Sequence, residues 1–353
     1  MTLRPLALLT CAASAAGCFG QSSGPGNGST HFDAGFGSDA AFDQDGAAPG
    51  DGGPDASGSA APGIYVTNQN DTVTVYALTA SGNEAPIRTL AGSKTQLSTP
   101  IGIRVDSKGE LLVANRVGGS VTVYPALATG NVAPTSTLTA TGMGSPEGLV
   151  LGPADDVYVG TCPGCGTANG GTVGVFHFPG ATGTSDLSIS GTSTGLTDPA
   201  SLALDGSGNL WVANALGGDV ALFTAGAKGN ATPTSSFTPT PTANTQSLAY
   251  GAGALFLAVP GAGIEIFRTT TTGSATAAAT LSSSTQLPIN YPAGLFVDSS
   301  ASPPTVYLND YGASAIYVIH TSGSSPNLTV SSVTTIQGAA TALNGPLGIH
   351  VVR

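Results

Sequence analysis

The chain has 353 residues, of which 41% are hydrophobic and only 8% are charged. An average soluble domain carries about 25% charged residues. Here Gly, Ser, Thr and Pro take their place, and these residues suit turns and exposed strands better than helices. The formal net charge is −11, and the nine Lys and Arg residues are scattered along the chain. This pattern excludes a nucleic-acid-binding protein, because such proteins need clustered basic side chains against phosphates.

The N-terminal segment predicts export. Arg4 is the only charged residue before the apolar run Leu6-Ala7-Leu8-Leu9. The run is too short to span a bilayer, which takes about 20 apolar residues, but it suits the hydrophobic region of a signal peptide. It is followed by Ala15-Ala16-Gly17-Cys18, which resembles the lipobox of bacterial lipoproteins and implies lipidation of Cys18. We predict a signal peptide over residues 1–17; the alternative to lipidation is ordinary cleavage and a free secreted protein.

Residues 18–62 are predicted to form a disordered tether. They are rich in Gly, Asp and Pro, as in Asp51-Gly52-Gly53-Pro54-Asp55, and show no apolar periodicity. Such a segment cannot bury enough surface to offset the entropy lost on ordering. Its Asp residues lack EF-hand spacing and the closing Glu, so we interpret them as a solvated linker rather than a calcium site.

From residue 63 to residue 353 one phrase recurs, and it predicts the fold. The phrase is Pro100-Ile101-Gly102-Ile103-Arg104-Val105-Asp106, followed by Leu111-Leu112-Val113-Ala114-Asn115. Its small residue returns at Gly148, Ser201, Ser247, Gly294 and Gly348. The steps from Gly102 onward are 46, 53, 46, 47 and 54 residues. These are lengths of one four-stranded blade of a β-propeller.

Four strands are expected in each unit. A first apolar strand ends in a turn such as Asp205-Gly206-Ser207-Gly208, and a second strand follows. A third strand alternates, as in Ser120-Val121-Thr122-Val123-Tyr124, which is typical of a strand with two different faces. The fourth strand follows Gly-Asn-x-x-Pro, as in Gly130-Asn131-Val132-Ala133-Pro134. Proline is tolerated there because an edge strand does not need every N–H group.

The two ends of the repeat region predict how the ring closes. Ile64-Tyr65-Val66-Thr67-Asn68 is a second strand without a first, and Pro346-Leu347-Gly348-Ile349-His350-Val351-Val352 is a first strand without a second. Pairing these segments completes one blade and removes the open ends. We therefore predict an all-β, six-bladed β-propeller over residues 63–353, closed by its N- and C-terminal strands, and we expect a monomer.

These phrases resemble the NHL-repeat family of β-propellers and, more loosely, gluconolactonase-like six-bladed propellers. The likeness lies in Pro-x-Gly-Ile-x-Val-Asp and Leu-x-Val-Ala-Asn and covers residues 63–353. It implies the architecture more strongly than any activity, because this fold carries many functions.

Propeller ligands usually lie over the central channel, on the face where first strands begin and second strands end. The residue before each recurring small residue is expected on this face: Ile101, Glu147, Ala200, Gln246, Ala293 and Leu347. So is the last residue of each second strand: Asn68, Asn115, Thr161, Asn214, Val259 and Asp310. The candidates that we single out are Asn68, Asn115, Glu147, Asn214 and Asp310.

Glu147 and Asp310 are the acids of these two sets and are candidate ligands for Ca²⁺ or Mg²⁺. The resemblance to gluconolactonases implies a cation that polarises a lactone carbonyl and activates water. Pro146-Glu147-Gly148 matches their glutamate-bearing strand, but the Pro-Asn-Gly that supplies their asparagine is missing. The alternative is that Asn and Asp end these strands because their side chains satisfy loop backbone groups.

Two further sets of residues are assigned structural roles. Cys162-Pro163-Gly164-Cys165 is expected to form a local disulfide in an exported protein, because a thioredoxin-like context for redox chemistry is missing. His177, His320 and His350 fall in different blades and are expected to be half-exposed strand residues.

The sequence thus favours a non-enzymatic binding module, held at the cell envelope by a lipid anchor or secreted. We expect a protein, peptide or glycan at the loop face, and no contact with a membrane except through the anchor. The alternatives are a divalent-metal-dependent lactonase or related hydrolase built around Glu147, and a purely structural envelope component.

Overall fold

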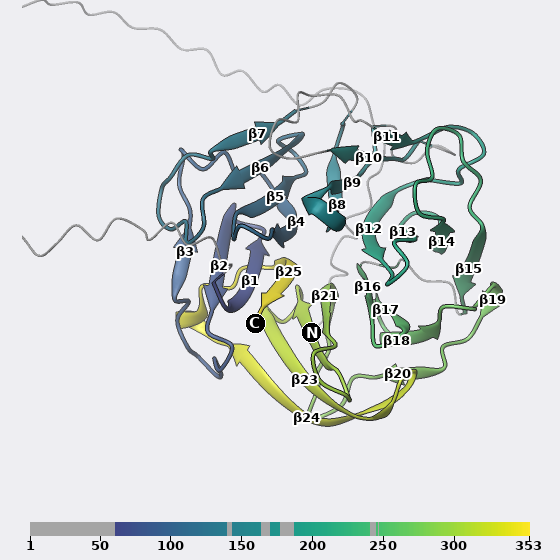
Figure 1. Cartoon of the computed structure of the whole chain (residues 1–353). Helices are drawn as coiled ribbons and strands as arrows, with labels where there is room; N and C mark the ends of the chain where they lie inside the picture. Colours follow the sequence, from purple (N-terminus) through teal and green to yellow (C-terminus); the bar gives the residue numbers. More distant parts are fainter. Residues whose placement is uncertain (1–60, 140–142, 164–169, 177–186, 241–244, 246) are drawn as a thin grey trace, which may run out of the picture. The chain divides into compact units, whose positions relative to one another are not determined.

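A computed structural model describes residues 61–353 except 140–142, 164–169, 177–186, 241–244 and 246. The described residues form six sheets placed around a central channel, as blades of a β-propeller (Figure 1). The fold class and the number of blades predicted from the repeat are therefore confirmed. The predicted signal peptide, Cys18 and nearly all of the tether lie outside the described residues.

In every blade the four strands of the repeat are ordered from the first, which lies innermost, to the fourth. Blade 1 contains β25 (Pro346–Val352), β1 (Gly63–Asn68), β2 (Thr72–Tyr76) and β3 (Arg88–Leu90). Blade 2 contains β4 (Pro100–Val105), β5 (Leu111–Asn115), β6 (Ser120–Tyr124) and β7 (Ser136–Leu138). Blade 3 contains β8 (Pro146–Leu151), β9 (Val157–Thr161), β10 (Thr172–Phe176) and β11 (Leu187–Ile189).

The other three blades keep this order with local additions. Blade 4 contains β12 (Pro199–Leu204), β13 (Leu210–Asn214), β14 (Asp219–Phe223) and β15 (Ser235–Pro239), extended by β19 (Gly273–Ala275). Blade 5 contains β16 (Ser247–Gly251), β17 (Ala254–Val259), β18 (Gly263–Arg268) and β20 (Ala279–Leu281). Blade 6 contains β21 (Pro292–Asp298), β22 (Thr305–Asp310), β23 (Ala315–Ser324) and β24 (Asn327–Gln337).

The ring closes as predicted, by pairing of the two ends of the repeat region. β1 pairs antiparallel with β25, with Ile64 opposite Val351 and Val66 opposite Ile349. Figure 1 shows the two strands side by side next to the channel. Because closure places the last strand in the first blade, neither terminal blade has an unpaired inner edge.

The hydrophobic core consists of the six spaces between neighbouring blades. Second strands are buried on both faces, so successive side chains pack against opposite neighbours. In β5, Val113 packs in the cluster toward blade 1, whereas Leu112 and Ala114 pack in the cluster toward blade 3. Each pair of adjacent blades shares one such cluster in the described residues. Side-chain interlocking, rather than a single central core, therefore holds the blades together.

The recurring glycine stands where two inner strands approach each other most closely. A Cβ atom added at Gly348 would overlap with the carbonyl oxygen of Ile101 in the next blade, and one at Gly294 would overlap with that of Leu347. The carbonyl belongs each time to the residue just before the next recurring small residue. Glycine is thus required at these positions because its neighbour's backbone occupies the space of a side chain.

Where the repeat has serine instead, the hydroxyl group joins the neighbouring strand. Ser201 Oγ accepts a hydrogen bond from Leu248 N at 2.9 Å, and Ser247 Oγ accepts one from Leu295 N at 3.2 Å. Both contacts use backbone N–H groups on the edge of an inner strand that pairs with no other strand of its sheet. The Gly/Ser alternation in the sequence therefore reflects two ways to fit neighbouring inner strands.

The Gly-Asn-x-x-Pro phrase forms a second set of links, at the outer edge of the ring. The asparagine side chain accepts a backbone hydrogen bond from the preceding blade, and the glycine N–H donates to its outer strand. The asparagine contacts are Asn83 with Ala340 N, Asn131 with Lys94 N and Asn230 with Ser193 N, each at 2.7 Å. The phrase that we used only to locate the fourth strand therefore also connects blades.

Irregular features lie outside the repeat. β19 pairs parallel with β15 and adds a fifth strand to blade 4, which the sequence did not predict. The 54-residue step is explained by the long β23–β24 hairpin, whose strands have 10 and 11 residues. The described part of the chain has two short 3₁₀ helices, Pro153–Asp155 and Ala339–Thr341, and none of its helices has the length and apolarity of a membrane span.

We predict that Gly348→Ala lowers the free energy of unfolding by about 1–3 kcal/mol, the usual cost of overpacking. The new methyl group has to displace the Ile101 carbonyl in the strand that closes the ring. Gly206→Ala is the matched control, because Gly206 lies in an open turn with no atom within 4 Å of an added Cβ. Urea unfolding measures both; equal stability of the two variants would contradict the proposed role of the recurring glycine.

Candidate functional site

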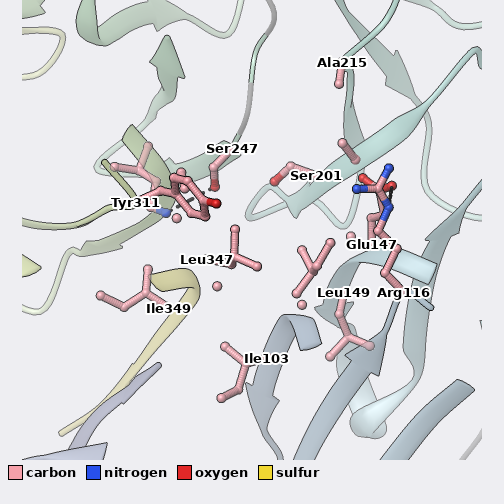
Figure 2. A pocket seen from close by; sticks show the side chains of 18 of the residues that line it. Ile103, Arg116, Glu147, Leu149, Ser201, Ala215, Ser247, Tyr311, Leu347 and Ile349 are labelled. Carbon is pink, nitrogen blue, oxygen red and sulfur yellow. Dashed lines mark hydrogen bonds and ion pairs between the residues drawn. The ribbon is translucent and has the colours of Figure 1, made fainter. Parts of the chain in front are cut away.

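A cavity of about 620 Å³ occupies the central channel where the inner strands begin. All six inner strands contribute to its wall, together with loops at that end of the propeller. This is the face on which we predicted the ligand site. Most of the wall is apolar, and Figure 2 shows Ile103, Leu149, Leu347 and Ile349 among its side chains.

The register predicted for the first strands agrees with the cavity. The residues before the recurring small residue line it, apart from Gln246, which lies outside the described residues: Ile101, Glu147, Ala200, Ala293 and Leu347. Glu147 is the one acidic side chain among these five. It faces the channel because it occupies the same strand position as apolar residues in the other blades.

The residues that end the second strands have a different role. Asn68, Asn115, Asn214 and Asp310 are fully buried, and the cavity is lined by other residues. Each accepts a hydrogen bond from a backbone N–H two residues before the proline that opens an inner strand. The donors are Ser98 for Asn115 (3.1 Å), Thr197 for Asn214 (3.2 Å), Asn344 for Asn68 (3.1 Å) and Asn290 for Asp310 (2.6 Å). These contacts agree with the alternative interpretation, in which such side chains fix the loops.

Three charged residues meet on one wall of the cavity. Glu147 is the second residue of β8, Arg116 follows β5, and Asp198 precedes β12, so adjacent blades bring them together. Arg116 Nε lies 2.9 Å from Glu147 Oε1, and Figure 2 shows the two side chains in contact. This short contact is an ion pair rather than an aligned hydrogen bond, and Asp198 Oδ1 is buried without a hydrogen-bond donor among the described residues. The pair is thus electrostatic, and the two carboxylates keep unused hydrogen-bonding capacity.

Burial changes the protonation of this cluster. It raises the pKa of Glu147 to about 7, with a further increase from the nearby Asp198 carboxylate and a partial decrease from Arg116. Burial likewise raises the pKa of Asp198, against the effect of Arg116. One Arg116 guanidinium cannot balance the charge of both Glu147 and Asp198. One of the two carboxyl groups therefore tends to hold a proton near neutral pH. We assign that proton to Glu147, because burial raises its pKa to about 7.

The donor set does not fit Ca²⁺ or Mg²⁺. The Asp310 carboxylate accepts hydrogen bonds from the backbone N–H groups of Asn290, Tyr291 and Ala313, and it is fully buried. Within the described residues, no group of three or more His, Cys, Asp or Glu side chains is arranged to hold a metal ion. At Glu147 the positive charge of Arg116, 2.9 Å from Oε1, opposes the binding of a second cation. Oxygen-rich coordination of six to eight ligands is therefore not provided here.

The rim of the cavity exposes hydrophobic side chains. Leu216, in the loop between β13 and β14, lines the cavity and is 37% exposed, and Val117 at the equivalent position of blade 2 is 74% exposed. Tyr291 and Tyr311 pack edge to face at 5.9 Å on the rim, and the Tyr311 hydroxyl donates to Gln69 Oε1. Exposed apolar side chains next to a cavity are typical of a surface that binds a partner or ligand.

Sequence reasoning missed Arg116 and Asp198, although a register signal for both exists. Arg116 directly follows Asn115, the last residue of its second strand, and Asp198 directly precedes Pro199, the first residue of its inner strand. These positions, one residue away from those that we selected, face the cavity. The side chain of the strand-ending Asn or Asp is buried against the loop. The next residue, such as Arg116 after Asn115, therefore lies at the rim of the cavity.

Cys162 forms a disulfide. Its predicted partner, Cys165, lies outside the described residues, so the pairing stays a prediction. Cys162 Sγ also lies 3.5 Å from Thr197 O, in the loop that leads to Asp198.

The structural comparisons agree with the fold. A streptogramin B lyase matches with a TM-score of 0.53 and 15% identity over 82% of this chain and 84% of that one. Virginiamycin B lyase from Staphylococcus aureus matches with a TM-score of 0.51 and 14% identity over 82% and 85%. A provisionally named 6-phosphogluconolactonase from Bacteroides uniformis matches with a TM-score of 0.53 and 16% identity over 82% and 84%. Searches with family models and against curated proteins gave no match. At these identities the likeness establishes the fold alone.

We predict that Glu147 makes stability depend on pH between about 4.5 and 7. The folded protein holds this proton more tightly than the unfolded chain, so stability is fully present below pH 4.5 and falls as pH rises through about 7. The loss from this group is about 3 kcal/mol, from 1.36 kcal/mol per pKa unit. Urea unfolding at pH 5 and pH 8 measures it. Glu147→Gln should lose most of the difference and exposed Glu84→Gln should keep it; an unchanged difference in Glu147→Gln would contradict the assignment.

Proposed function

We propose that this protein is a binding propeller whose central cavity takes a short peptide with hydrophobic side chains. The observation that supports this proposal is the cavity itself: about 620 Å³, bounded by all six inner strands. Sites for small ligands are typically concave and mainly apolar, with a few converging polar groups. The apolar wall and the single charged cluster around Glu147 meet that description.

The chemistry of the wall favours a peptide over a glycan. A sugar presents hydroxyl groups on every side and needs many hydrogen-bond partners, often with an aromatic surface beneath it. Here Ile and Leu side chains form much of the wall, and the two aromatic rings, Tyr291 and Tyr311, pack against each other at the rim. A peptide matches because its side chains can fill the apolar part while its N–H groups reach the carboxylates.

Glu147 and Asp198 supply the polar anchor in this proposal. Asp198 Oδ1 is buried without a donor among the described residues, Glu147 has Arg116 as its one charged partner there, and both acids line the cavity. A buried acceptor without a donor costs about 1–3 kcal/mol. A ligand amide or ammonium group that donates to them would remove this cost, which gives the site a reason to prefer N–H donors.

Acid–base catalysis is the second candidate function, favoured by the raised pKa of Glu147. A carboxyl group with a pKa of about 7 beside a second carboxylate can give and take protons at neutral pH. Proteins of the same fold include ones named as lyases and a provisionally named lactonase. This version of the hydrolase hypothesis depends on proton transfer by Glu147 and assigns no role to a metal ion.

To test the binding function, we would incubate the protein with a library of tripeptides bearing Leu, Ile or Phe, identify complexes by native mass spectrometry and measure affinities by calorimetry. Ala200→Phe should weaken binding at least about tenfold, because Ala200 lines the cavity and the added ring fills it. Ala85→Phe is the control, since Ala85 is exposed in an outer loop and its variant should bind normally.

Three outcomes decide between the candidates. Equal affinity of the Ala200→Phe variant, or binding of oligosaccharides but no peptide, would contradict the peptide proposal. Cleavage of a bound tripeptide or of a lactone that disappears in Glu147→Gln would favour the enzyme. Peptide binding without turnover would support the binding module.

We further propose that the propeller works outside the cytoplasm, held at the cell envelope, on the outer membrane, by lipid on Cys18 or released by ordinary signal cleavage. The signal-like segment and the Gly/Asp/Pro-rich stretch after it support this location. Mass spectrometry of the mature N-terminus should show Cys18 carrying acyl chains, and Cys18→Ser should abolish that modification. An unmodified first residue other than Cys18 would contradict lipidation.

A further inference from the structure

Arg104 and His350 occupy the same register of the repeat, two residues after the recurring small residue, and Arg104 lines the cavity. The inner strands run from the cavity rim toward the far end of the channel, so a residue two positions after the recurring small residue lies deeper. The residues in this register are Arg104, Val150, Ala203, Ala249, Phe296 and His350, and the four apolar ones pack in the hydrophobic clusters between blades. Four are apolar, and the two polar ones, Arg104 and His350, come from adjacent inner strands, β4 and β25.

Arg104 is a cation without a counter-ion. It lines the cavity, and burial lowers its pKa to about 10. One guanidinium nitrogen donates to the Ile103 carbonyl at 2.6 Å, and no carboxylate of the described residues pairs with it. A guanidinium has five N–H donors, so most of its donors lack a protein acceptor. Arg104 is half-buried, and none of its nitrogens is a buried atom without a partner, so its remaining N–H groups stay accessible to water or to a ligand.

His350 lies beside Arg104 and is also unsatisfied. Burial and the positive charge of Arg104 together lower the pKa of His350 to about 3, so the ring is neutral at physiological pH. Its Nδ1 is buried without a hydrogen-bond partner in the described residues. The ring packs edge to face on Phe296 at 5.3 Å, which fixes its plane. A neutral imidazole can donate one N–H, in addition to those of Arg104.

We propose that Arg104, with His350 beside it, forms an anion subsite at the floor of the cavity, which binds the carboxylate group of the ligand. The guanidinium presents two parallel N–H groups that match a carboxylate, and such charge-assisted bonds are about twice as strong as neutral ones. One guanidinium beside a neutral histidine balances a single negative charge, which favours a carboxylate over a phosphate dianion. The inference rests on the proposed function, because it identifies the carboxylate as the end of the bound peptide.

The distance between the two polar regions sets the length of that peptide. Arg104 stands three residues further along its strand than Ile101, which is the equivalent of Glu147 in blade 2. Three strand residues span roughly 10 Å. A di- or tripeptide has a similar length when extended, roughly 3.3–3.6 Å per residue. Its ammonium group would reach Glu147 and Asp198 while its carboxylate reaches Arg104, and its side chains would lie against the apolar wall.

The test uses 4-methylpentanoate and its neutral amide, which have nearly the same shape and do not depend on peptide recognition. Calorimetry on the full protein should give at least about tenfold tighter binding of the acid, which corresponds to one charge-assisted contact. Arg104→Met keeps the side-chain stem and should remove this preference. Arg268→Met, at an exposed arginine on blade 5, should keep it.

A second measurement covers the case that Arg104→Met does not fold. The chain has four histidines, so the imidazole NMR signals of the wild-type protein are few, and His350→Gln identifies the signal of His350. Titration with 4-methylpentanoate should shift that signal. An unmoved His350 signal, or equal binding of acid and amide, would overturn the subsite.

Further measurements distinguish the anion subsite from peptide binding, and a carboxylate from a phosphate ligand. Inorganic phosphate that binds more tightly than 4-methylpentanoate, and does so through Arg104, would overturn the carboxylate assignment. A preference for the acid that needs Arg104, in a protein that binds no tripeptide, would leave the subsite valid and refute peptide binding. Tripeptides that bind equally as free acids and as amides would refute the subsite and leave peptide binding valid.

Discussion

The close approach of neighbouring inner strands around the channel is the constraint on which the rest of the structure depends. At Gly294 and Gly348 the carbonyl oxygen of the adjacent strand occupies the space of a Cβ atom. Six strands brought this close can form a ring only if the last one pairs with the first segment of the chain, as β25 does with β1. Outside this inner ring, the blade interfaces are filled by hydrophobic clusters and the outer strands are linked by the Gly-Asn phrase. Neighbouring blades are therefore joined at three distances from the channel: at the inner strands, at the blade interfaces and at the outer strands. These contacts give the channel a rigid wall.

A rigid wall in a repeated register explains how the site acquires its chemistry. Each strand position occurs six times around the channel, and most positions are apolar or small. A charged residue at one of them becomes a single functional group in an apolar ring, as Glu147 does among Ile101, Ala200, Ala293 and Leu347. The same holds deeper in the channel for Arg104. A repeat fold can thus change its ligand by one substitution without loss of the scaffold.

The two polar regions of the cavity are electrostatically incomplete in complementary ways. The Glu147–Asp198 pair has one guanidinium for two carboxylates, and burial raises the pKa of both acids. Arg104 has no carboxylate partner in the described residues, and His350 beside it is kept neutral. Buried groups of this kind reduce stability and are retained where they serve binding or catalysis. The carboxyl groups on one wall can accept hydrogen bonds from a ligand, and Arg104 at the floor can donate them. A zwitterionic ligand, which has an ammonium group and a carboxylate, would match both.

The sequence by itself determined the blade count, the strand order and the closure, because these follow from a repeat whose period and turn residues are visible in one dimension. It also placed Glu147 on the channel wall, since residues at one register of a repeat share one environment. Only the tertiary structure decided that Asn68, Asn115, Asn214 and Asp310 turn away from the cavity and hold the loops. It also decided that Arg116 and Asp198 join Glu147, and that Arg104 lacks a counter-ion. Such pairings depend on side-chain direction and on contacts between different blades, so the register of the repeat can place a residue near the cavity but cannot name its partner.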